Sequence, residues 1–373
     1  MRVYLSEALR ILLRKLRAEF KGIKKYEGSD ETICTNIIRD CYNHENNYFM
    51  VSNGHFSEFY ARDFGWCVHA LLRLGYRKEV INTLEYALMA YKRHGSIEQA
   101  ISPRGKAFTF PHAYSPDALA FIIRSLKLAR ATTLVKKHKV FLEQEIRRYY
   151  NTVINKATGL VRKDKLFSSM RDYAIRQSSC YDNVMTGMLA NDLKELGVLI
   201  NPFKKYDYKR ILIENFWTGR YFLNDLSGDR SVVGDANVLP FWSGLITNKK
   251  MLRKTINTIT AEGLDNPFPL KYARSRFKEH RMILLDFLVR NYQTDSVWAH
   301  LGMMYIEVLA RINKKLAQKH LCQYKRLVEK HKNFLEVYDA EGRLFKSLFY
   351  YADEGMLWAA NYLHLRRLLL QNV

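Results

Sequence analysis

The sequence predicts an all-α protein that is built from a series of helical hairpins. Amphipathic segments with apolar residues at helical spacing recur along the 373 residues, and several of them end at a glycine. Segments with strict alternation, which would indicate strands, are few and short. The chain has only 7 prolines and no linker rich in proline, glycine and serine, so we expect one domain over residues 1–373.

The expected helices follow one another closely. The clearest start is Ser115-Pro116-Asp117, with a capping serine, a proline at the first helical position and an acid in the first turn. We expect helices over residues 66–74, 78–91, 116–131, 140–151, 181–196, 238–246, 249–262, 295–314, 317–330 and 354–369. Short extended pieces are expected at residues 96–101, 159–161, 220–223 and 336–338.

Residues 1–25 predict a peripheral basic amphipathic helix. Leucines recur at helical spacing from Leu5 to Leu16, and four basic residues between Arg10 and Arg17 interrupt the apolar run. The segment therefore lacks the unbroken apolar centre of a signal peptide, and no 18-residue apolar span occurs in the chain. The helix either packs on the domain or associates weakly with a membrane surface.

Helical hairpins in series either stack as a solenoid or close into a ring. No fixed repeat length occurs, which argues against a regular solenoid. Long, unequal loops rich in aspartate, tryptophan, tyrosine and arginine favour the ring. In a ring of helix pairs, the loops at one end meet at a central pocket, so we expect the chemistry there.

The charge and the cysteines restrict the class of protein further. The formal net charge is +23, but the basic residues are scattered, which favours a solvated surface over an arm for nucleic acid. Attraction to an acidic substrate, an anionic membrane or RNA is the alternative. Five cysteines without paired spacing predict neither a disulfide framework nor a zinc site, and they favour a cytoplasmic location. With no nucleotide-binding or metalloprotease motif, we expect no metal ion and no cofactor.

Clusters of polar and aromatic residues lie at the expected helix boundaries. They are residues 56–66 (FSEFYARDFGW), 177–183 (QSSCYDN), 292–300 (YQTDSVWAH) and the linked pieces 334–339 (FLEVYD) and 350–358 (YYADEGMLW). Each cluster alone is explained by helix caps or by core aromatics. Together they supply what glycoside hydrolysis needs, namely two carboxylates, aromatic platforms and groups that bind hydroxyls.

In this order the clusters resemble the motifs of the six-hairpin glycosidases, in particular trehalases and the related processing α-glucosidases and glucosylglycerate hydrolases. QSSCYDN resembles their acid segment (ESGWDFS or ESGMDNS), which implies Asp182 as the general acid. FLEVYD resembles their base segment (VEKYD), which implies Glu336 as the general base. The resemblance spans residues 56–362. It implies an (α/α)6 toroid with short β pieces in its loops, and an inverting, exo-acting α-glycosidase.

The resemblance also implies a set of sugar-binding side chains. YARDFGW resembles YYWDSYW of trehalases, YQTDSVWAH resembles QWDYPNGWAP, and the segment 235–237 resembles their DLN motif. The implied set is Arg62, Asp63, Trp66, Arg176, Tyr181, Asn183, Asp235, Asn237, Asp295, Trp298, His300, Glu354 and Trp358. The tryptophans either stack on sugars or pack in the core, and Arg176 either binds an anionic aglycone or pairs with Asp172. Gln177 and Ser179 depart from the acid motif, so the resemblance does not determine which sugar the protein acts on.

The expected partner is a small glycoside or an oligosaccharide, and no nucleic acid. A general acid must be protonated, and Asp182 lies at an expected helix start, where the helix dipole favours the charged form. Burial must therefore outweigh the dipole at this residue. The alternatives are a carbohydrate-binding barrel without a working carboxylate and a basic helical protein that binds RNA or anionic lipid. The sequence leaves the oligomeric state open.

Overall fold

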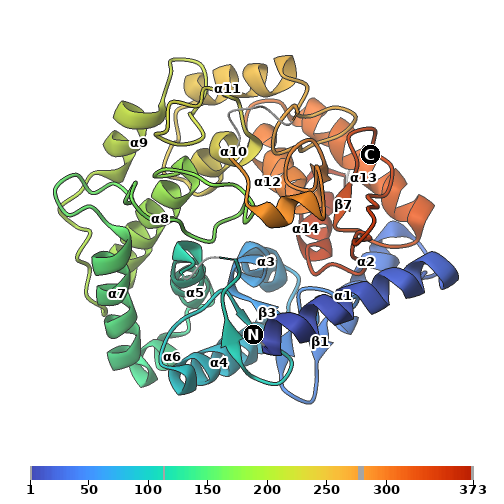
Figure 1. The fold of residues 1–373 in the computed structure, drawn as a ribbon, viewed down its shortest axis with the longest axis horizontal. Helices are drawn as coiled ribbons and strands as arrows, with labels where there is room; N and C mark the ends of the chain where they lie inside the picture. Colours follow the sequence, from blue (N-terminus) through green and yellow to red (C-terminus); the bar gives the residue numbers. More distant parts are fainter. Residues whose placement is uncertain (1, 112–113, 276–280, 371–373) are drawn as a thin grey trace.

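The computed structural model describes residues 2–111, 114–275 and 281–370. Within these ranges, twelve helices form two concentric rings (Figure 1). The inner ring consists of α3 (Ala61–Arg73), α5 (Pro116–Leu128), α8 (Cys180–Leu196), α10 (Gly234–Trp242), α12 (Ala299–Ala310) and α14 (Ala359–Leu369). Each inner helix packs against the next, and α14 packs against α3, which closes the ring. The expected (α/α)6 toroid is confirmed.

The outer helices cover the inner ring and complete the hairpins. They are α2 (Asp30–Asp40), α4 (Arg77–His94), α7 (Lys139–Val153), α9 (Tyr208–Phe216), α11 (Lys249–Ala261) and α13 (Lys314–His331), with the short α6 (Thr132–Lys137) beside α7. Inner helices such as α12 are buried on nearly all sides, whereas α13 is amphipathic with a basic outer face. This difference follows from position, because only the outer helices have a face to solvent.

Most expected helices are present with shifted ends, and the shifts have local causes. Helix α12 begins at Ala299 because residues 297–298 pair as a strand, and α14 begins at Ala359 because the preceding residues form a bridged loop. Helices α4 and α8 end at Gly95 and Gly197, where a left-handed residue closes the last turn as the sequence predicts. The structure adds α2, α6 and α9, which have no counterpart among the expected helices.

Seven strands of two residues each occur in the described residues, all in loops. They are β1 (Tyr42–Asn43), β2 (Tyr48–Phe49), β3 (Phe59–Tyr60), β4 (Ala100–Ile101), β5 (Ala107–Phe108), β6 (Val297–Trp298) and β7 (Val337–Tyr338). All pairings are antiparallel, in the orders β1-β2, β3-β4-β5 and β6-β7. Strands β3 and β6 lead directly into α3 and α12, so they fix the loops at the starting end of the inner helices.

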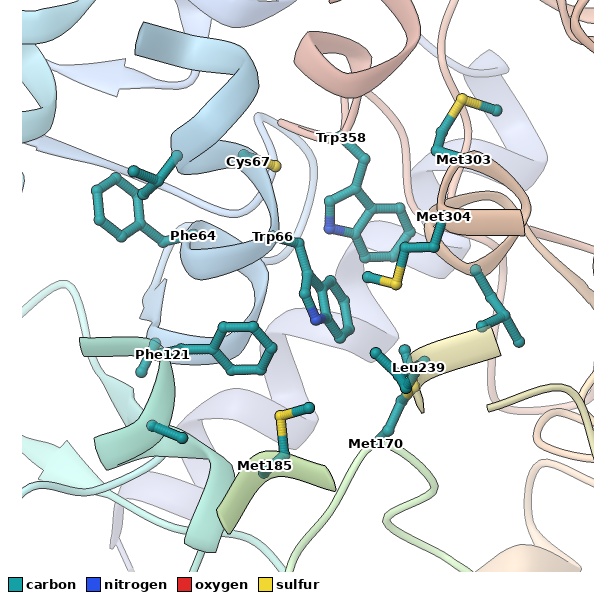
Figure 2. Packing of buried hydrophobic residues seen from close by; sticks show 14 of the residues in the cluster. Phe64, Trp66, Cys67, Phe121, Met170, Met185, Leu239, Met303, Met304 and Trp358 are labelled. Carbon is teal, nitrogen blue, oxygen red and sulfur yellow. The ribbon is translucent and has the colours of Figure 1, made fainter. Parts of the chain in front are cut away.

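The apolar core fills the inner ring. Figure 2 shows Trp66 of α3 at its centre, with Phe121 of α5, Leu239 of α10 and Met304 of α12 around it. Helices α3 and α5 approach closely at Gly65, where a Cβ atom would lie 2.5 Å from the Phe121 ring. The centre of the barrel is therefore packed with side chains and is not an open channel.

Helix α1 (Arg2–Lys21) is not part of either ring, and it crosses the front of the barrel in Figure 1. Arg14 anchors it, because its Nη1 donates hydrogen bonds to the backbone oxygens of Tyr351 (2.9 Å) and Ala352 (2.7 Å). Across the three described ranges, no helix has both the length and the apolar character needed to cross a membrane.

Candidate active site

A cavity of about 450 Å³ lies at the end of the barrel where the inner helices begin. The first turns of α3 and α12 contribute Arg62, Asp63 and His300 to its wall. The loop before α12 contributes Trp298, and the loop before α14 contributes Glu336 and Trp358. Helix α1 covers part of the mouth with Ile11 and other residues. Because inner helices that start at one end bring six loops together there, residues far apart in sequence share this cavity.

Asp172 lies in the cavity wall in a loop between α7 and α8. Its carboxylate oxygens are 3.3 and 3.4 Å from the Arg62 guanidinium, and Gln99 Nε2 donates to it at 3.3 Å. Arg62 makes its short bond to Asp117, at 2.6 Å, so most of its charge is compensated there. Burial raises the pKa of Asp172 to about 6, and Arg62 opposes that rise.

Glu336 faces the cavity from the residue before β7. Tyr292 donates its hydroxyl to Oε1 at 2.5 Å, and Oε2 accepts from the Tyr350 hydroxyl at 2.6 Å and from the Asp353 backbone N–H at 2.9 Å. Burial raises the pKa of Glu336 to about 7, with a further rise from the charge of Asp353. The three donors oppose this rise because they stabilise the carboxylate.

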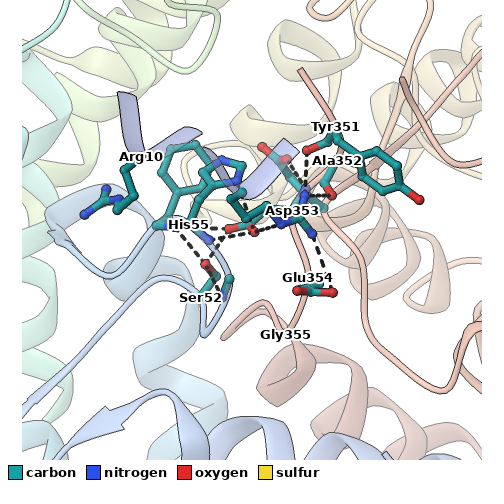
Figure 3. A network of polar contacts seen from close by, with 12 residues as sticks. Arg10, Ser52, His55, Tyr351, Ala352, Asp353, Glu354 and Gly355 are labelled. Atoms are coloured by element: carbon teal, nitrogen blue, oxygen red, sulfur yellow. Dashed lines mark hydrogen bonds and ion pairs between the residues drawn. The ribbon is translucent and has the colours of Figure 1, made fainter. Parts of the chain in front are cut away.

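A polar network around Asp353, whose backbone N–H donates to Glu336, holds the loop of Asp353 in place (Figure 3). The Asp353 carboxylate accepts hydrogen bonds from the Ser52 hydroxyl and from the His55 backbone N–H, and the His55 Nδ1 atom lies 3.2 Å from it. Burial alone would raise the pKa of Asp353, but His55 and Arg14 outweigh it and the pKa is lowered. Asp353 therefore remains charged. The contacts of its side chain orient its backbone N–H, which donates to Glu336.

Asp63 is the third carboxyl group in the cavity wall. Trp358 Nε1 donates to it at 3.2 Å, and burial raises the pKa of Asp63 to about 7 although Arg62 lowers it. Asp63 makes fewer contacts with donors than Glu336 does, so its oxygens are available to the hydroxyls of a ligand. Binding of sugar hydroxyls is also the role that the resemblance implies for Asp63.

Aromatic rings line the remaining wall of the cavity. Trp66 stacks on His300 with ring centroids 4.3 Å apart and an interplanar angle of 10°. Trp358 contacts the same histidine at 4.6 Å, and Trp298 lies 5.2 Å from it. Burial lowers the pKa of His300 well below its ordinary value, so its ring is neutral and accepts from or donates to the Tyr272 hydroxyl at 3.2 Å. The three tryptophans both pack together and face the cavity.

The structure brings together only part of the predicted site. The predicted residues that line the cavity are Arg62, Asp63, Trp66, Trp298, His300, Glu336 and Trp358. The predicted residues that do not line it are Arg176, Tyr181, Asp182, Asn183, Asp235, Asn237, Asp295 and Glu354. The first group comes from α3 and the C-terminal third of the chain, and most of the second group comes from α8 and α10.

Asp182 is buried away from the cavity, in the first turn of α8. Its oxygens accept hydrogen bonds from the hydroxyls of Ser169 (2.8 and 2.9 Å) and Ser179 (2.6 Å), and its own N–H donates to Ser179, the N-cap. Burial does raise the pKa of Asp182 to about 6, as the sequence reasoning required. The carboxyl group is nevertheless held by two serines of its own region and is not presented to the cavity.

The other residues of α8 and its loop make structural contacts. Arg176 forms a buried ion pair of 2.7 Å with Asp235, and not the pair with Asp172 that was one of its two expected roles. Tyr181 donates its hydroxyl to Asp117 at 2.7 Å, which supports the carboxylate that binds Arg62. Asn183 accepts from the backbone N–H of residue 161 at 3.0 Å and thereby ties the preceding loop to α8.

The remaining predicted residues also serve the scaffold. Asn237 makes three hydrogen bonds, two to the backbone of Phe222 and one to the backbone oxygen of residue 233. Glu354 accepts from the Lys24 backbone N–H at 2.7 Å and lies 3.5 Å from Arg14, so it anchors the N-terminal segment. Asp295 is half-buried and accepts a hydrogen bond from the adjacent threonine at 3.3 Å.

Sequence reasoning missed several residues of the cavity. It gives Asp172 only the role of a partner for Arg176, and it assigns no role to Tyr292, Tyr350 or Gln99. Tyr292 and Tyr350 are the first residues of two of the clusters, which is a usable signal. Asp172 lies in a loop without periodicity, and nothing in its local sequence marks it as a residue of the cavity.

The described residues contain no group of three or more His, Cys, Asp or Glu side chains arranged to hold a metal ion. What the arrangement can do is acid–base chemistry. Three carboxyl groups with raised pKa values, those of Asp63, Asp172 and Glu336, face one aromatic cavity, and each is held by donors from different parts of the chain.

Comparison with known proteins agrees with the fold. No protein-family model and no curated sequence matches the chain. A GH63 mannosylglycerate hydrolase from Thermus thermophilus in complex with glucose superposes with a TM-score of 0.63 at 13% identity, over 91% of this chain and 100% of that one. A glycosidase in complex with glucose gives 0.65 at 11% identity, over 98% of both chains. A rhamnosidase from Klebsiella oxytoca gives 0.64 at 11%, over 91% of this chain and 63% of that one. The fold is that of the six-hairpin glycosidases.

Proposed function

We propose that the chain is a glycoside hydrolase that cleaves an α-linked glycoside with inversion at the anomeric carbon. The observation that carries this proposal is the presence of Asp172 and Glu336 on the wall of one cavity, each with a raised pKa. An inverting glycosidase needs such a pair of carboxyl groups, one as the general acid and one as the general base. Solved structures of the same fold include hydrolases of mannosylglycerate and glycosidases bound to glucose, which supports the assignment.

Asp172 takes the role of general acid in this proposal, in place of Asp182. Only Asp172 faces the cavity, and its long contacts with Arg62 leave the protonated form accessible near neutral pH. Glu336 takes the role of general base, because Tyr292 and two further donors stabilise its carboxylate.

The reaction then needs no group beyond these two and a water molecule. Asp172 transfers its proton to the glycosidic oxygen as the bond from that oxygen to the anomeric carbon breaks. Glu336 accepts a proton from the water whose oxygen attacks the anomeric carbon from the opposite face. The products are the free alcohol and a sugar of inverted anomeric configuration, and the proton gained by Glu336 returns to Asp172 through solvent.

Exo-action on a terminal sugar is part of the proposal. The packed core beneath the cavity, with Trp66 at its centre, leaves no passage for a chain that continues through the barrel (Figure 2). Asp63 and Arg62 are placed to bind hydroxyls, and Trp298 and Trp358 to cover apolar sugar faces. Trehalose and short α-glucosides are the first substrates to test, because the sequence motifs resemble those of enzymes that act on them.

A cytoplasmic location is also part of the proposal. The five free cysteines support a reducing, cytoplasmic compartment.

Product analysis by NMR tests this proposal directly. The full chain is incubated with trehalose, maltose, isomaltose, kojibiose and glucosylglycerate, and the first anomer released is recorded before mutarotation. An α-glucoside that yields β-glucose supports the proposal. Inverting hydrolysis of trehalose releases one β-glucose and one α-glucose, because the leaving sugar keeps its α configuration. For the other substrates, release of the non-reducing glucose as the α anomer would show retention and would make Glu336 or Asp172 a nucleophile. Sugar binding without turnover on the panel would favour a non-catalytic carbohydrate-binding barrel.

A further inference from the structure

Three segments around the mouth of the cavity expose large apolar side chains. We call residues 9–20 of α1, residues 284–288 around η1 (Leu284–Phe287) and residues 348–349 the apolar rim. The exposed fraction is 86% for Phe20, 91% for Leu284, 79% for Phe287 and 75% for Leu348. Such values are unusual for side chains of this size, because water contact with their full surface is unfavourable.

The rim belongs to the cavity and is not spread over the molecule. Ten of the fifteen large apolar side chains exposed in the described residues lie in these three segments, so the exposure is concentrated at one place. Each segment also contributes a residue to the cavity wall, namely Leu12, Leu288 and Phe349. The rim therefore surrounds the opening through which a substrate enters.

Helix α1 presents one face inward and another outward. Ile11 lines the cavity, and Arg14 on the inner side anchors the helix to the loop before α14. Leu9, Leu13, Leu16 and Phe20 follow at intervals of four, three and four residues, which places them on one outward stripe that is 40–86% exposed. The side chains of this stripe are exposed, so the helix does not use them to pack against the described part of the chain.

Basic side chains accompany the apolar ones. Arg17 and Lys21 are exposed on α1, Arg281 and Arg290 flank the η1 segment, and Lys346 lies beside the third segment. Residues 2–25 contain eight lysines and arginines against two glutamates, and the acid within residues 281–290, Asp286, is buried. An exposed apolar stripe with basic neighbours matches the interface of an anionic bilayer, with its apolar interior and negatively charged surface.

We propose that the apolar rim docks on an anionic lipid surface, so that the cavity receives the sugar of a glycoside anchored in that surface. The docking half of this inference stands on the rim alone, whereas the substrate half rests on the proposed glycoside hydrolysis. Because α1 is too rich in charge to cross a bilayer, it lies in the plane of the interface. In this position the mouth opens toward the membrane, and the aglycone stays in the lipid while the sugar enters.

Vesicle flotation of the full chain tests docking without reference to activity. The probe is vesicles of phosphatidylglycerol and phosphatidylcholine in equal parts, compared with vesicles of phosphatidylcholine alone. We expect the wild-type chain to float with the first and not with the second. The double variant Leu13→Glu/Phe287→Glu should lose at least about tenfold in affinity, because both apolar contacts are replaced by charges that the anionic surface repels.

A matched control comes from an outer helix of the barrel. Val140 of α7 is 72% exposed, close to the value for Phe287, but lies outside the rim. Val140→Glu adds a charge in the same way and should leave flotation unchanged. The variant Arg17→Glu/Lys21→Glu should weaken binding by about fivefold for each basic side chain that is removed. Equal flotation of the rim variant and the Val140 variant would overturn the proposal.

Two further measurements, the oligomeric state and the hydrolysis of two glycosides, distinguish a failure of the docking proposal from a failure of the proposed function. A shift from dimer to monomer in the rim variant, with no flotation of the wild type, would overturn the proposal and make the rim an interface between copies of the chain. Hydrolysis of a soluble aryl glycoside should be equal in the wild type and the rim variant, whereas hydrolysis of a vesicle-bound alkyl glycoside should fall about tenfold. Flotation without hydrolysis of either glycoside would leave docking in place and refute the proposed function.

Discussion

Asp172 lies against Arg62, which approaches both of its carboxylate oxygens at 3.3–3.4 Å, while Arg62 makes a bond of 2.6 Å to Asp117. Arg62 is thus shared between a buried structural carboxylate and a carboxyl group that faces the cavity. The shorter bond fixes the guanidinium, and the longer contacts orient Asp172 without holding it fully ionised. This relationship distinguishes Asp172 from Asp182, whose oxygens are bound by serines.

The first prediction compares the two aspartates. Asp172→Asn and Glu336→Gln should each lower kcat by about 10²- to 10⁴-fold, because each removes one proton-transfer group. Asp182→Asn should keep turnover within a few-fold of the wild type, since the amide can still accept from Ser179. The measurement is steady-state hydrolysis of the substrate found by NMR, with circular dichroism to verify folding. A large loss in Asp182→Asn alone would return the acid role to that residue.

The pH dependence of kcat/KM should be bell-shaped, with a narrow optimum between about pH 6 and pH 7. The active form carries its one proton on Asp172 and none on Glu336. It is the minor one-proton form of the pair, because the pKa of Glu336 is raised to about 7 and that of Asp172 only to about 6. Activity falls at lower pH because both groups are protonated, and at higher pH because both are ionised. The two limbs belong to the pair as a whole. A profile that is flat from pH 5 to pH 8 would contradict the assignment.

Removal of one donor from Glu336 should shift this profile. Tyr292→Phe deletes the hydroxyl that donates to Oε1 at 2.5 Å. Since that bond stabilises the carboxylate, its loss raises the pKa of Glu336 and moves the profile to higher pH. The comparison is with Tyr173→Phe, a tyrosine of the same cavity for which no bond to Glu336 is found. Equal profiles for the two variants would show that Tyr292 only packs.

The cost of burying the charge on Glu336 should be visible in stability. Its folded pKa of about 7 lies above the ordinary value of 4.5, so ionisation destabilises the fold. This cost is absent below pH 4.5, grows as the pH rises and is complete above pH 7, where it amounts to roughly 3 kcal/mol. Relative to Glu336→Gln, the wild type should therefore lose stability between these pH values. Chemical denaturation at pH 5 and pH 8 measures the difference, and a constant difference would contradict it.

The buried pair of Arg176 and Asp235 should act on stability and not on substrate. Arg176→Met leaves the Asp235 carboxylate unpaired in the core and should destabilise the fold by about 3–5 kcal/mol. The double variant Arg176→Met/Asp235→Asn should recover part of this loss, because no unpaired charge remains. Thermal unfolding measures both. A changed KM with unchanged stability in Arg176→Met would instead indicate the sugar-binding role that the sequence predicts.

The sequence by itself determined the helices and their order, because local forces decide them. Apolar periodicity set α4, α11 and α13, and capping residues such as Ser179 and Gly197 set the ends of α8. The long, unequal loops favoured the closed ring, and the resemblance pointed to Glu336 and Trp358, which both line the cavity. These two lie next to β7 and α14, whose positions follow from local sequence.

The tertiary structure alone decided which acidic side chains share the cavity. Asp172 has no helical period or cap to direct it, and its orientation comes from Arg62, a residue of α3 far away in the sequence. Asp182 has a stronger local pattern, but that pattern is an N-cap, which turns its carboxylate toward Ser179. The physical reason is the same in both cases. A side chain in a loop takes its direction from the partners that the fold supplies, and those partners become neighbours only when the ring closes.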